Sequence, residues 1–275
     1  MSIAAGAWHT RVREHECDPL GHVNNAWYLA YLQQATVELW GSEAPVYWQL
    51  QSLALEYLTP ALEGDELAVY GWPIEREGEA LRCGYEVQRR DDGQPLARGL
   101  ALWVWLDRCT RQPLSPAEIE RAQPPAGCAP PRPLRLAADT LAGQVFRWRH
   151  TVRHHEAGPS GQVRPLEILH WVEEAKFVAC STVGWPLERM LAENCLIVQV
   201  RHDSEFLAPL APGDEIEIHS RVCDLGRVRG AWHQEVRCRG ELAATDYSTG
   251  AFLDRTGRPH PPPQAMLDAL IGRER

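Results

Sequence analysis

A proline-rich segment near the middle of the chain sets the strongest limit on what this sequence can fold into. Residues 123–133 read QPPAGCAPPRP and contain five prolines among eleven residues. Because proline fixes φ and lacks a backbone N–H, the segment cannot sustain a helix or a central strand. We predict a semi-rigid, extended linker over 123–143. It would separate an N-terminal domain, 1–122, from a C-terminal domain, 144–275, each of an ordinary size for one domain.

The two halves repeat the same order of segments. Each begins with a strand-like stretch, continues through a short turn containing proline and glycine, and enters a largely apolar helix. In the first helix, eleven of the fifteen residues in 26–40 are apolar. That is too many for a surface helix with one wet side, so we expect this helix to be largely buried. The paired segments are 7–16 and 146–156 (strands), 18–25 and 158–165 (turns), and 26–40 and 166–183 (helices).

Strand signals follow the helix in both halves. The stretches 56–67 and 205–216 match in residue type at most positions, including a Gly-Asp turn. Apolar residues then alternate in 81–87 and 232–238, which is the period of half-buried antiparallel strands. The Asp-Gly pair at 92–93 is a hairpin signal. We therefore predict a duplicated α+β domain, each copy with a strand, a long helix and three or four antiparallel strands.

The composition is that of a globular protein and argues against several function classes. With 44% hydrophobic and 24% charged residues, the chain is not mainly disordered. A net charge of −9 argues against a nucleic-acid partner. The sequence has neither the long apolar run of a membrane helix nor the pattern of a signal peptide, so no membrane partner is expected.

The cysteines and histidines indicate neither a redox motif nor a metal site. The eight cysteines are scattered without CxxC spacing, which favours reduced thiols and a cytoplasmic location. The neighbours His154 and His155 have no third ligand at a recognisable spacing, so we predict no metal.

The sharpest local feature is the turn DPLGHVNN, 18–25, which lies between the first strand and the first helix. It places the carboxylate of Asp18, the imidazole of His22 and the amides of Asn24 and Asn25 before a helix N-terminus. Free N–H groups there can polarise a carbonyl, and a carboxylate beside them can attack it or activate water. The same residues also suit plain turn and capping chemistry. Spacing alone leaves both interpretations open.

A resemblance favours the catalytic interpretation. The run DPLGHVNNAWYLAY, Asp18 to Tyr31, resembles the hotdog-fold acyl-CoA thioesterases of the 4-hydroxybenzoyl-CoA thioesterase type. Plant acyl-ACP thioesterases carry a similar HVNN turn in a tandem hotdog chain. The resemblance covers 8–107 and, more weakly through the repeat, 146–254. It implies two tandem hotdog domains, each a long central helix wrapped by an antiparallel sheet, paired as an internal pseudo-dimer.

The resemblance also implies an activity and a set of site residues. The chain would hydrolyse an acyl-CoA to free acid and CoA, in fatty acid metabolism, without a cofactor. Asp18 would be nucleophile or general base, and the N–H near Asn25 would polarise the carbonyl. An acyl-ACP substrate and a homo-oligomer of such chains remain open. The residues assigned to catalysis are Asp18, His22, Asn24 and Asn25, and those assigned to substrate binding are Gly21, Tyr28 and Tyr31.

The second half departs from this pattern. A glycine cannot replace a carboxylate, and a proline at the helix start removes the N–H that would polarise the carbonyl. We therefore predict that the second turn is inert. The first helix also has Gln33 and Gln34 where several relatives carry a glutamate, and the second has Glu173 and Glu174. In the repeat, Asp18, His22, Asn24 and Asn25 are replaced by Gly158, Gln162, Arg164 and Pro165.

Two rival functions come from other classes. A hotdog hydratase or dehydratase would pair Asp and His at a longer spacing than Asp18 and His22 have. A non-catalytic acyl-thioester-binding module would fit the altered second turn, but the intact Asp18 turn argues against it. Acyl chain length, and aliphatic or aromatic character, are left open by the sequence.

Overall fold

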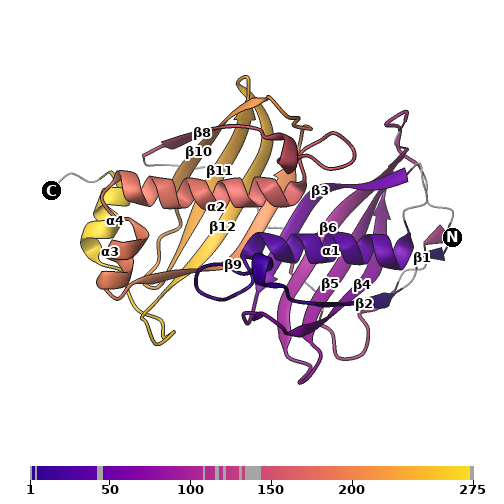
Figure 1. The fold of residues 1–275 in the computed structure, drawn as a ribbon, viewed down its shortest axis with the longest axis horizontal. Coiled ribbons are helices and arrows are strands. Elements are labelled where there is room, and N and C mark those ends of the chain that lie inside the picture. Colours follow the sequence, from indigo (N-terminus) through magenta and orange to yellow (C-terminus); the bar gives the residue numbers. More distant parts are fainter. Residues whose placement is uncertain are drawn as a thin grey trace. The chain divides into compact units, whose positions relative to one another are not determined.

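Each half of the chain folds into a long helix packed against an antiparallel sheet in the computed structural model (Figure 1). The structure describes residues 2–3, 5–41, 46–107, 109–114, 118–119, 122–129, 132–133 and 144–272. Contacts divide the chain into Met1–Leu134, called unit 1, and Arg135–Arg275, called unit 2. Of the predicted linker, 130–131 and 134–143 lie outside the described residues. The domain limits read from the sequence stay a prediction.

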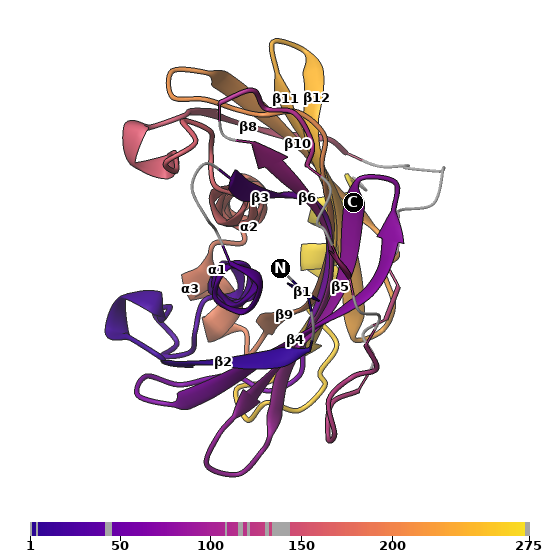
Figure 2. The same cartoon turned by 90° about the vertical axis from the view of Figure 1, so that its right-hand side faces the viewer.

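Unit 1 holds α1 on the concave side of a five-stranded antiparallel sheet, and Figure 2 looks along this helix. Hydrogen bonding runs in the order β2-β4-β5-β6-β3, and a short parallel pair joins β1 to β7. The helix starts one residue before the predicted 26–40. The elements are β1 Ser2–Ile3, β2 Gly6–Arg11, α1 Asn25–Trp40, β3 Val46–Tyr57, β4 Glu66–Glu77, β5 Ala80–Arg89, β6 Pro95–Asp107 and β7 Glu118–Ile119.

Unit 2 repeats this arrangement in the order β8-β10-β11-β12-β9 and adds two short helices. These helices, α3 and α4, pack beside the end of α2 in one apolar cluster that includes Trp185, Met190 and Met266. Neither helix was predicted from the sequence. The elements are β8 Phe146–Thr151, α2 Pro165–Thr182, α3 Leu187–Ala192, β9 Leu196–Phe206, β10 Glu215–Cys223, β11 Arg229–Cys238, β12 Glu241–Leu253 and α4 Gln264–Ile271.

The predicted duplication extends to irregular details of the backbone. Each sheet has a register shift in the same strand pair, between Leu50 and Ser52 in unit 1 and opposite Thr249 and Gly250 in unit 2. Such bulges bend a strand locally and are specific features of a fold. Two helices of similar length against two sheets with matched strand orders confirm the predicted α+β repeat.

The outer face of the first sheet is covered by the described part of the proline-rich segment. We call residues 122–129 and 132–133 the strap. The Ala122 N–H donates to the Pro73 carbonyl, and the Ala129 N–H donates to Glu86 Oε2, both at 3.0 Å. Glu86 is fully buried there and pairs with Arg98 at 2.8 Å. The prediction that 81–87 is half-buried is therefore wrong. On the second face of β5, the strap and Arg98 cover Glu86, and Trp72 packs against Gly84.

Replacing Gly84 of β5 by alanine is expected to lower the free energy of unfolding by about 1–3 kcal/mol. An alanine Cβ would lie 2.5 Å from Cε2 of Trp72, a rigid ring that is only 1% exposed. Chemical denaturation measures the loss. Gly158→Ala is the control, because its nearest neighbouring atom lies at 3.6 Å and its effect should stay under about 0.5 kcal/mol. Equal stability of both variants would contradict the predicted clash.

Candidate functional site

The turn between β2 and α1 is closed by several backbone hydrogen bonds. The Asp18 N–H donates to the His22 carbonyl at 2.7 Å, and the Gly21 N–H donates to the Asp18 carbonyl at 2.9 Å. Gly21 has a φ of 80°, a left-handed conformation that glycine adopts without strain. His22 is partly exposed, and its backbone forms an isolated bridge with Leu62. The predicted site residues of this turn are therefore brought together by backbone hydrogen bonds.

The carboxylate of Asp18 is oriented by the same turn. Its Oδ1 accepts hydrogen bonds from the N–H of Leu20 at 2.8 Å and from the N–H of His22 at 3.2 Å. Among the described residues, no donor is hydrogen-bonded to Oδ2. The side chain is partly exposed. One carboxylate oxygen is thus used to fix the turn, while the other can meet a substrate or a water.

The first residues of α1 present one open backbone donor. Asn24 is the N-cap, and its side-chain oxygen accepts from the Ala26 N–H at 3.0 Å. The Trp27 N–H donates to the Asn24 carbonyl at 3.0 Å. Within the part of the chain that the structure describes, the N–H of Asn25 donates to no acceptor. A helix N-terminus carries partial positive charge, so this N–H suits a carbonyl oxygen that gains negative charge.

Tyr28 and Tyr31 lie buried behind the turn and use their hydroxyls internally. Tyr28 Oη accepts from the Ala61 N–H at 3.0 Å, and Tyr31 Oη donates to Glu16 Oε2 at 2.8 Å. Burial raises the pKa of Tyr28 to about 12, and burial together with Glu16 raises the pKa of Tyr31 further. Both phenols are therefore neutral near pH 7. The Tyr28 hydroxyl positions the backbone at Ala61, and the Tyr31 hydroxyl positions Glu16 before the turn.

Glu16 is a structural residue that the sequence analysis missed. It is 3% exposed, and its Oε2 also accepts from the Arg13 N–H at 2.7 Å. A signal was available in the repeat, because Glu156 occupies the matching place before the second turn. Glu156 accepts from the N–H of Arg153 and from Trp171 Nε1, where unit 1 has Tyr31. The two carboxylates thus anchor the two turns to their helices.

The second turn keeps the backbone of the first without its side chains. The Gly158 N–H donates to the Gln162 carbonyl at 2.8 Å, and the Gly161 N–H donates to the Gly158 carbonyl at 2.9 Å. Arg164 stands at the N-cap of α2 without a side-chain cap, and Pro165 is the first helical residue. Where unit 1 has an aspartate and an open N–H, unit 2 has a glycine and a proline.

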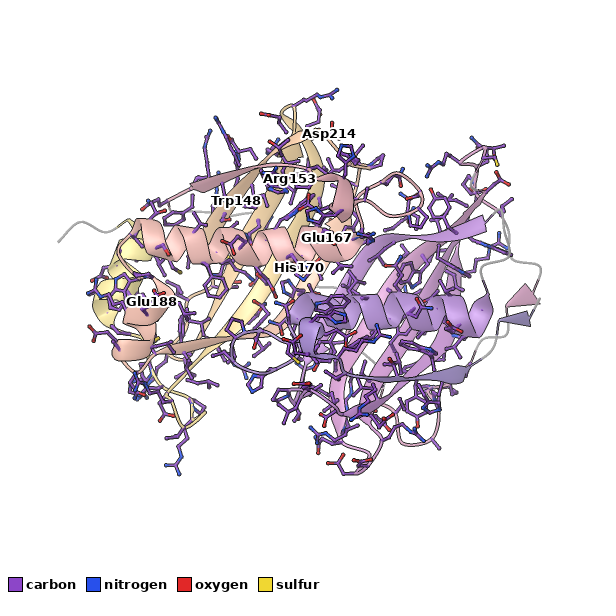
Figure 3. The ribbon with its side chains drawn as sticks, in the orientation of Figure 1. Trp148, Arg153, Glu167, His170, Glu188 and Asp214 are labelled. Atoms are coloured by element: carbon purple, nitrogen blue, oxygen red, sulfur yellow. The ribbon has the colours of Figure 1, made fainter. Side chains whose placement is uncertain are left out.

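Charged side chains at the start of α2 and on β8 contact neighbouring charged or titratable groups. Figure 3 shows Arg153 beside the turn and Glu167 and His170 on the first turns of α2, where His170 Nδ1 lies 3.2 Å from Glu167 Oε2. On β8, Arg149 pairs with Glu217 at 2.8 Å. Hydrogen bonds from His219 and Arg149 lower the pKa of Glu217 to about 2. These contacts tie neighbouring strands and helix turns together.

A second polar centre, which the sequence analysis did not predict, lies inside unit 2. His202 of β9 is fully buried, and its Nδ1 lies 3.0 Å from both oxygens of Asp246 on β12. Its Nε2 lies 3.6 Å from Glu173 Oε1 on α2. Lys176, one helical turn further on, donates to Ser248 Oγ at 3.2 Å. We call Glu173, Lys176, His202 and Asp246 the buried charge cluster.

The described residues contain neither a candidate metal site nor a helix that could span a membrane. No group of three or more His, Cys, Asp or Glu side chains among the described residues is placed to hold a metal ion. In the same residues, no helix combines the length and the apolar character needed to cross a membrane.

Solved structures with the same fold include two thioesterases. A structure described as an acyl-ACP thioesterase from Bacteroides thetaiotaomicron is 15% identical, with a TM-score of 0.64 over 90% of this chain and 97% of that one. A 12:0-ACP thioesterase from Umbellularia californica is 13% identical, with a TM-score of 0.67 over 90% and 94%. At this identity the likeness shows the fold alone.

Family comparison identifies both halves of the chain. No curated protein matches the sequence. The family model of the thioesterase-like superfamily matches residues 12–127 and again 152–270, which is most of the chain in two tandem copies. Together with the two helix-and-sheet repeats, this match establishes the predicted tandem hotdog architecture. The chain belongs to the thioesterase-like superfamily and is a thioester hydrolase.

Proposed function

We propose that the chain hydrolyses acyl-CoA to free acid and CoA at the turn 18–25 of unit 1. The observation that carries the proposal is the open N–H of Asn25 at the start of a 16-residue helix, in the same turn as the Asp18 carboxylate. Ala26 and Trp27, the next two residues, already use their N–H groups at the cap. One donor and one carboxylate are the minimum that polarisation and attack on a thioester require.

The chemistry follows from these two groups. The thioester oxygen accepts from the Asn25 N–H, which stabilises negative charge as the carbonyl carbon is attacked. Asp18 either attacks this carbon itself, releasing the thiolate and leaving an anhydride that water hydrolyses, or takes a proton from the attacking water. Both routes end in a free acid and a thiol. We propose that His22 and Asn24 orient water or substrate, and that Gly21, Tyr28 and Tyr31 shape the binding surface.

The carrier is the main alternative within this proposal. Two proteins of similar fold are described as acyl-ACP thioesterases, so an acyl-ACP substrate is the second candidate. We also retain as proposals the pairing of the two units as an internal dimer and a cytoplasmic location. The internal dimer rests on the resemblance to tandem hotdog thioesterases, and the cytoplasmic location rests on the scattered cysteines.

Thiol release from purified protein tests the proposal. A panel of acyl-CoAs, short to long and aromatic, is assayed beside the matching acyl-ACPs. Faster release from at least one acyl-CoA than from its acyl-ACP counterpart supports the proposal. Faster release from acyl-ACP would move the assignment to the second candidate. Release from neither carrier would overturn both.

Gly158→Asp in unit 2 is expected to add no thioesterase activity. The new carboxylate would lie in a turn whose backbone matches that of the first turn. However, Pro165 at the first position of α2 has no N–H to polarise a carbonyl. The comparison is made in an Asp18→Asn background, so that any gain in thiol release is visible. A rate above that background would show that unit 2 is inert only for lack of a carboxylate.

A further inference from the structure

Lys176 is the only lysine among the 28 Lys and Arg residues of the chain. Every other permanent cation is an arginine, which stays charged and forms planar ion pairs. A lysine differs in one chemical respect, because it can lose its proton and then act as a nucleophile or base. Lys176 is therefore the one side chain among these cations that is suited to act as a nucleophile or base.

Lys176 lies where its amine loses a proton more readily than an exposed lysine does. On α2, its Nζ donates to Gln199 Oε1 at 2.8 Å and to Ser248 Oγ at 3.2 Å, and both acceptors are neutral. The charged and titratable groups that face it are Glu173 and Cys180 on α2, Asp246 on β12 and His202 on β9. Burial lowers the pKa of Lys176, and the two carboxylates offset only part of this shift.

Unit 1 shows that the fold does not need these charges. The cross-strand pairs His202–Ser248 and Ser204–Asp246 correspond in the repeat to Leu53–Ala101 and Leu55–Gly99. Buried ion pairs are seldom more stabilising than apolar residues of similar volume. A cluster that the sister unit lacks is thus better explained by a chemical role than by packing.

Lys176 lies at a partly exposed end of the buried charge cluster, with an apolar side chain nearby. Lys176 and Gln199 are partly exposed, whereas His202 is fully buried. Ile197, two residues before Gln199 on β9, is 38% exposed. A partly exposed lysine at one end of a buried polar cluster, with an aliphatic side chain nearby on β9, suits an activated acyl group.

We infer that Lys176 is an acyl-acceptor site, which acyl thioesters modify covalently. The unprotonated Nζ attacks the thioester carbonyl, a C–N bond forms, the C–S bond breaks, and the thiolate takes up the proton that Nζ loses. The products are an amide on Lys176 and a free thiol, and no further reactant is needed. The inference rests on the proposed function, because the acyl donor belongs to the same substrate class.

The test uses octanoyl-CoA with the full chain carrying Asp18→Asn, so that the thioester persists, and with the same chain also carrying Lys176→Arg. Intact mass and peptide mapping locate each acyl group. We expect one octanoyl group at Lys176, added at pH 8 at least about tenfold faster than to Nα-acetyl-lysine amide, since lowered pKa and proximity both favour attack. Acylation no faster than this reference overturns the inference.

Two neighbouring carboxylates provide matched variants. Glu173→Gln removes a carboxylate that stabilises the ammonium form, so acylation of Lys176 should become faster. Glu174→Gln changes the next residue, which is exposed, and should leave the rate unchanged. An equal response to both changes contradicts the assigned environment of the amine.

Failure of the inference is distinguishable from failure of the proposed function. Thiol release by the wild-type chain without Lys176 acylation overturns the acceptor site and leaves the hydrolase intact. Acylation of Lys176 without catalytic turnover supports the acceptor site and counts against hydrolysis at Asp18. Labelling of Lys176 by trinitrobenzenesulfonate without acylation by octanoyl-CoA also overturns the inference, because the amine is then reactive but is no thioester acceptor.

Discussion

Asp18→Asn is expected to lower the turnover of an acyl thioester by about 10²–10⁴-fold. Asparagine keeps the shape of the side chain, and its carbonyl oxygen can still accept from the N–H groups of Leu20 and His22. It cannot act as a nucleophile or a base, so the loss falls on the chemical step. Single-turnover thiol release measures the rate, and chemical denaturation checks that the fold is kept.

Asp254 in unit 2 offers a matched control. Its Oδ1 accepts from the N–H of Thr256 at 2.8 Å and of Arg258 at 3.0 Å, the same two-and-four-residue pattern as in the Asp18 turn. Asp254→Asn should therefore affect its turn much as Asp18→Asn does, while leaving turnover near the wild-type rate. If the Asp18 variant retains more than about a tenth of the activity, another group is the base.

Asp246→Ala is expected to lower the free energy of unfolding by about 3–5 kcal/mol, because it leaves buried positive charge uncompensated. Asp246 is 2% exposed and contacts both His202 and the hydroxyl of Ser204, which donates to Oδ1 at 2.6 Å. Chemical denaturation at neutral pH measures the effect. Asp91→Ala, at an exposed carboxylate, should change stability by less than about 0.5 kcal/mol.

The loss of unfolding free energy caused by Asp246→Ala should become smaller as the pH falls. Burial raises the pKa of Asp246, but His202, Lys176 and Ser204 lower it by more, so the net shift is downward. A lowered carboxyl pKa stabilises the fold above the unfolded value of about 4, and that stability is lost as pH falls through the folded pKa. The difference between wild type and Asp246→Ala should therefore narrow in acid. If the loss of unfolding free energy caused by Asp246→Ala stays constant from neutral pH to strong acid, the loss comes from packing and not from charge.

The titration of the buried His202 limits the stability of the fold on the alkaline side. Burial lowers the pKa of His202, but Asp246 and Glu173 raise it by more, so the net shift is upward. Its contribution is complete below the unfolded pKa of about 6.5 and is lost as pH rises through the folded value. The buried charge cluster should thus stabilise unit 2 most between the two transitions.

The regular elements could be predicted from the sequence because local signals agree with the final packing. Fifteen mostly apolar residues after a polar turn give a buried helix in unit 1, and the repeat gives its partner. The helix α3 could not be predicted in the same way. It has six residues, too few to be stable alone, and it is held by tertiary contacts of Trp185 and Met190.

The candidate site was predictable where it is continuous in sequence. The turn 18–25 could be found because its groups lie within eight residues. The buried charge cluster could not, since His202 and Asp246 are 44 residues apart and meet only when β9 and β12 pair. Comparison of the repeats would have revealed polar residues at inward positions, where unit 1 has Leu53 and Gly99.

The strap over the first sheet changes the entropy of folding as well as the contacts. Ordering a residue costs about 1–2 kcal/mol of backbone entropy, and the hydrogen bonds from the N–H groups of Ala122 and Ala129 offset part of this cost. Proline reduces the freedom of the unfolded chain, so its ordering costs less. The prolines that prevent a strand here therefore lower the conformational entropy cost of holding this irregular segment over Glu86.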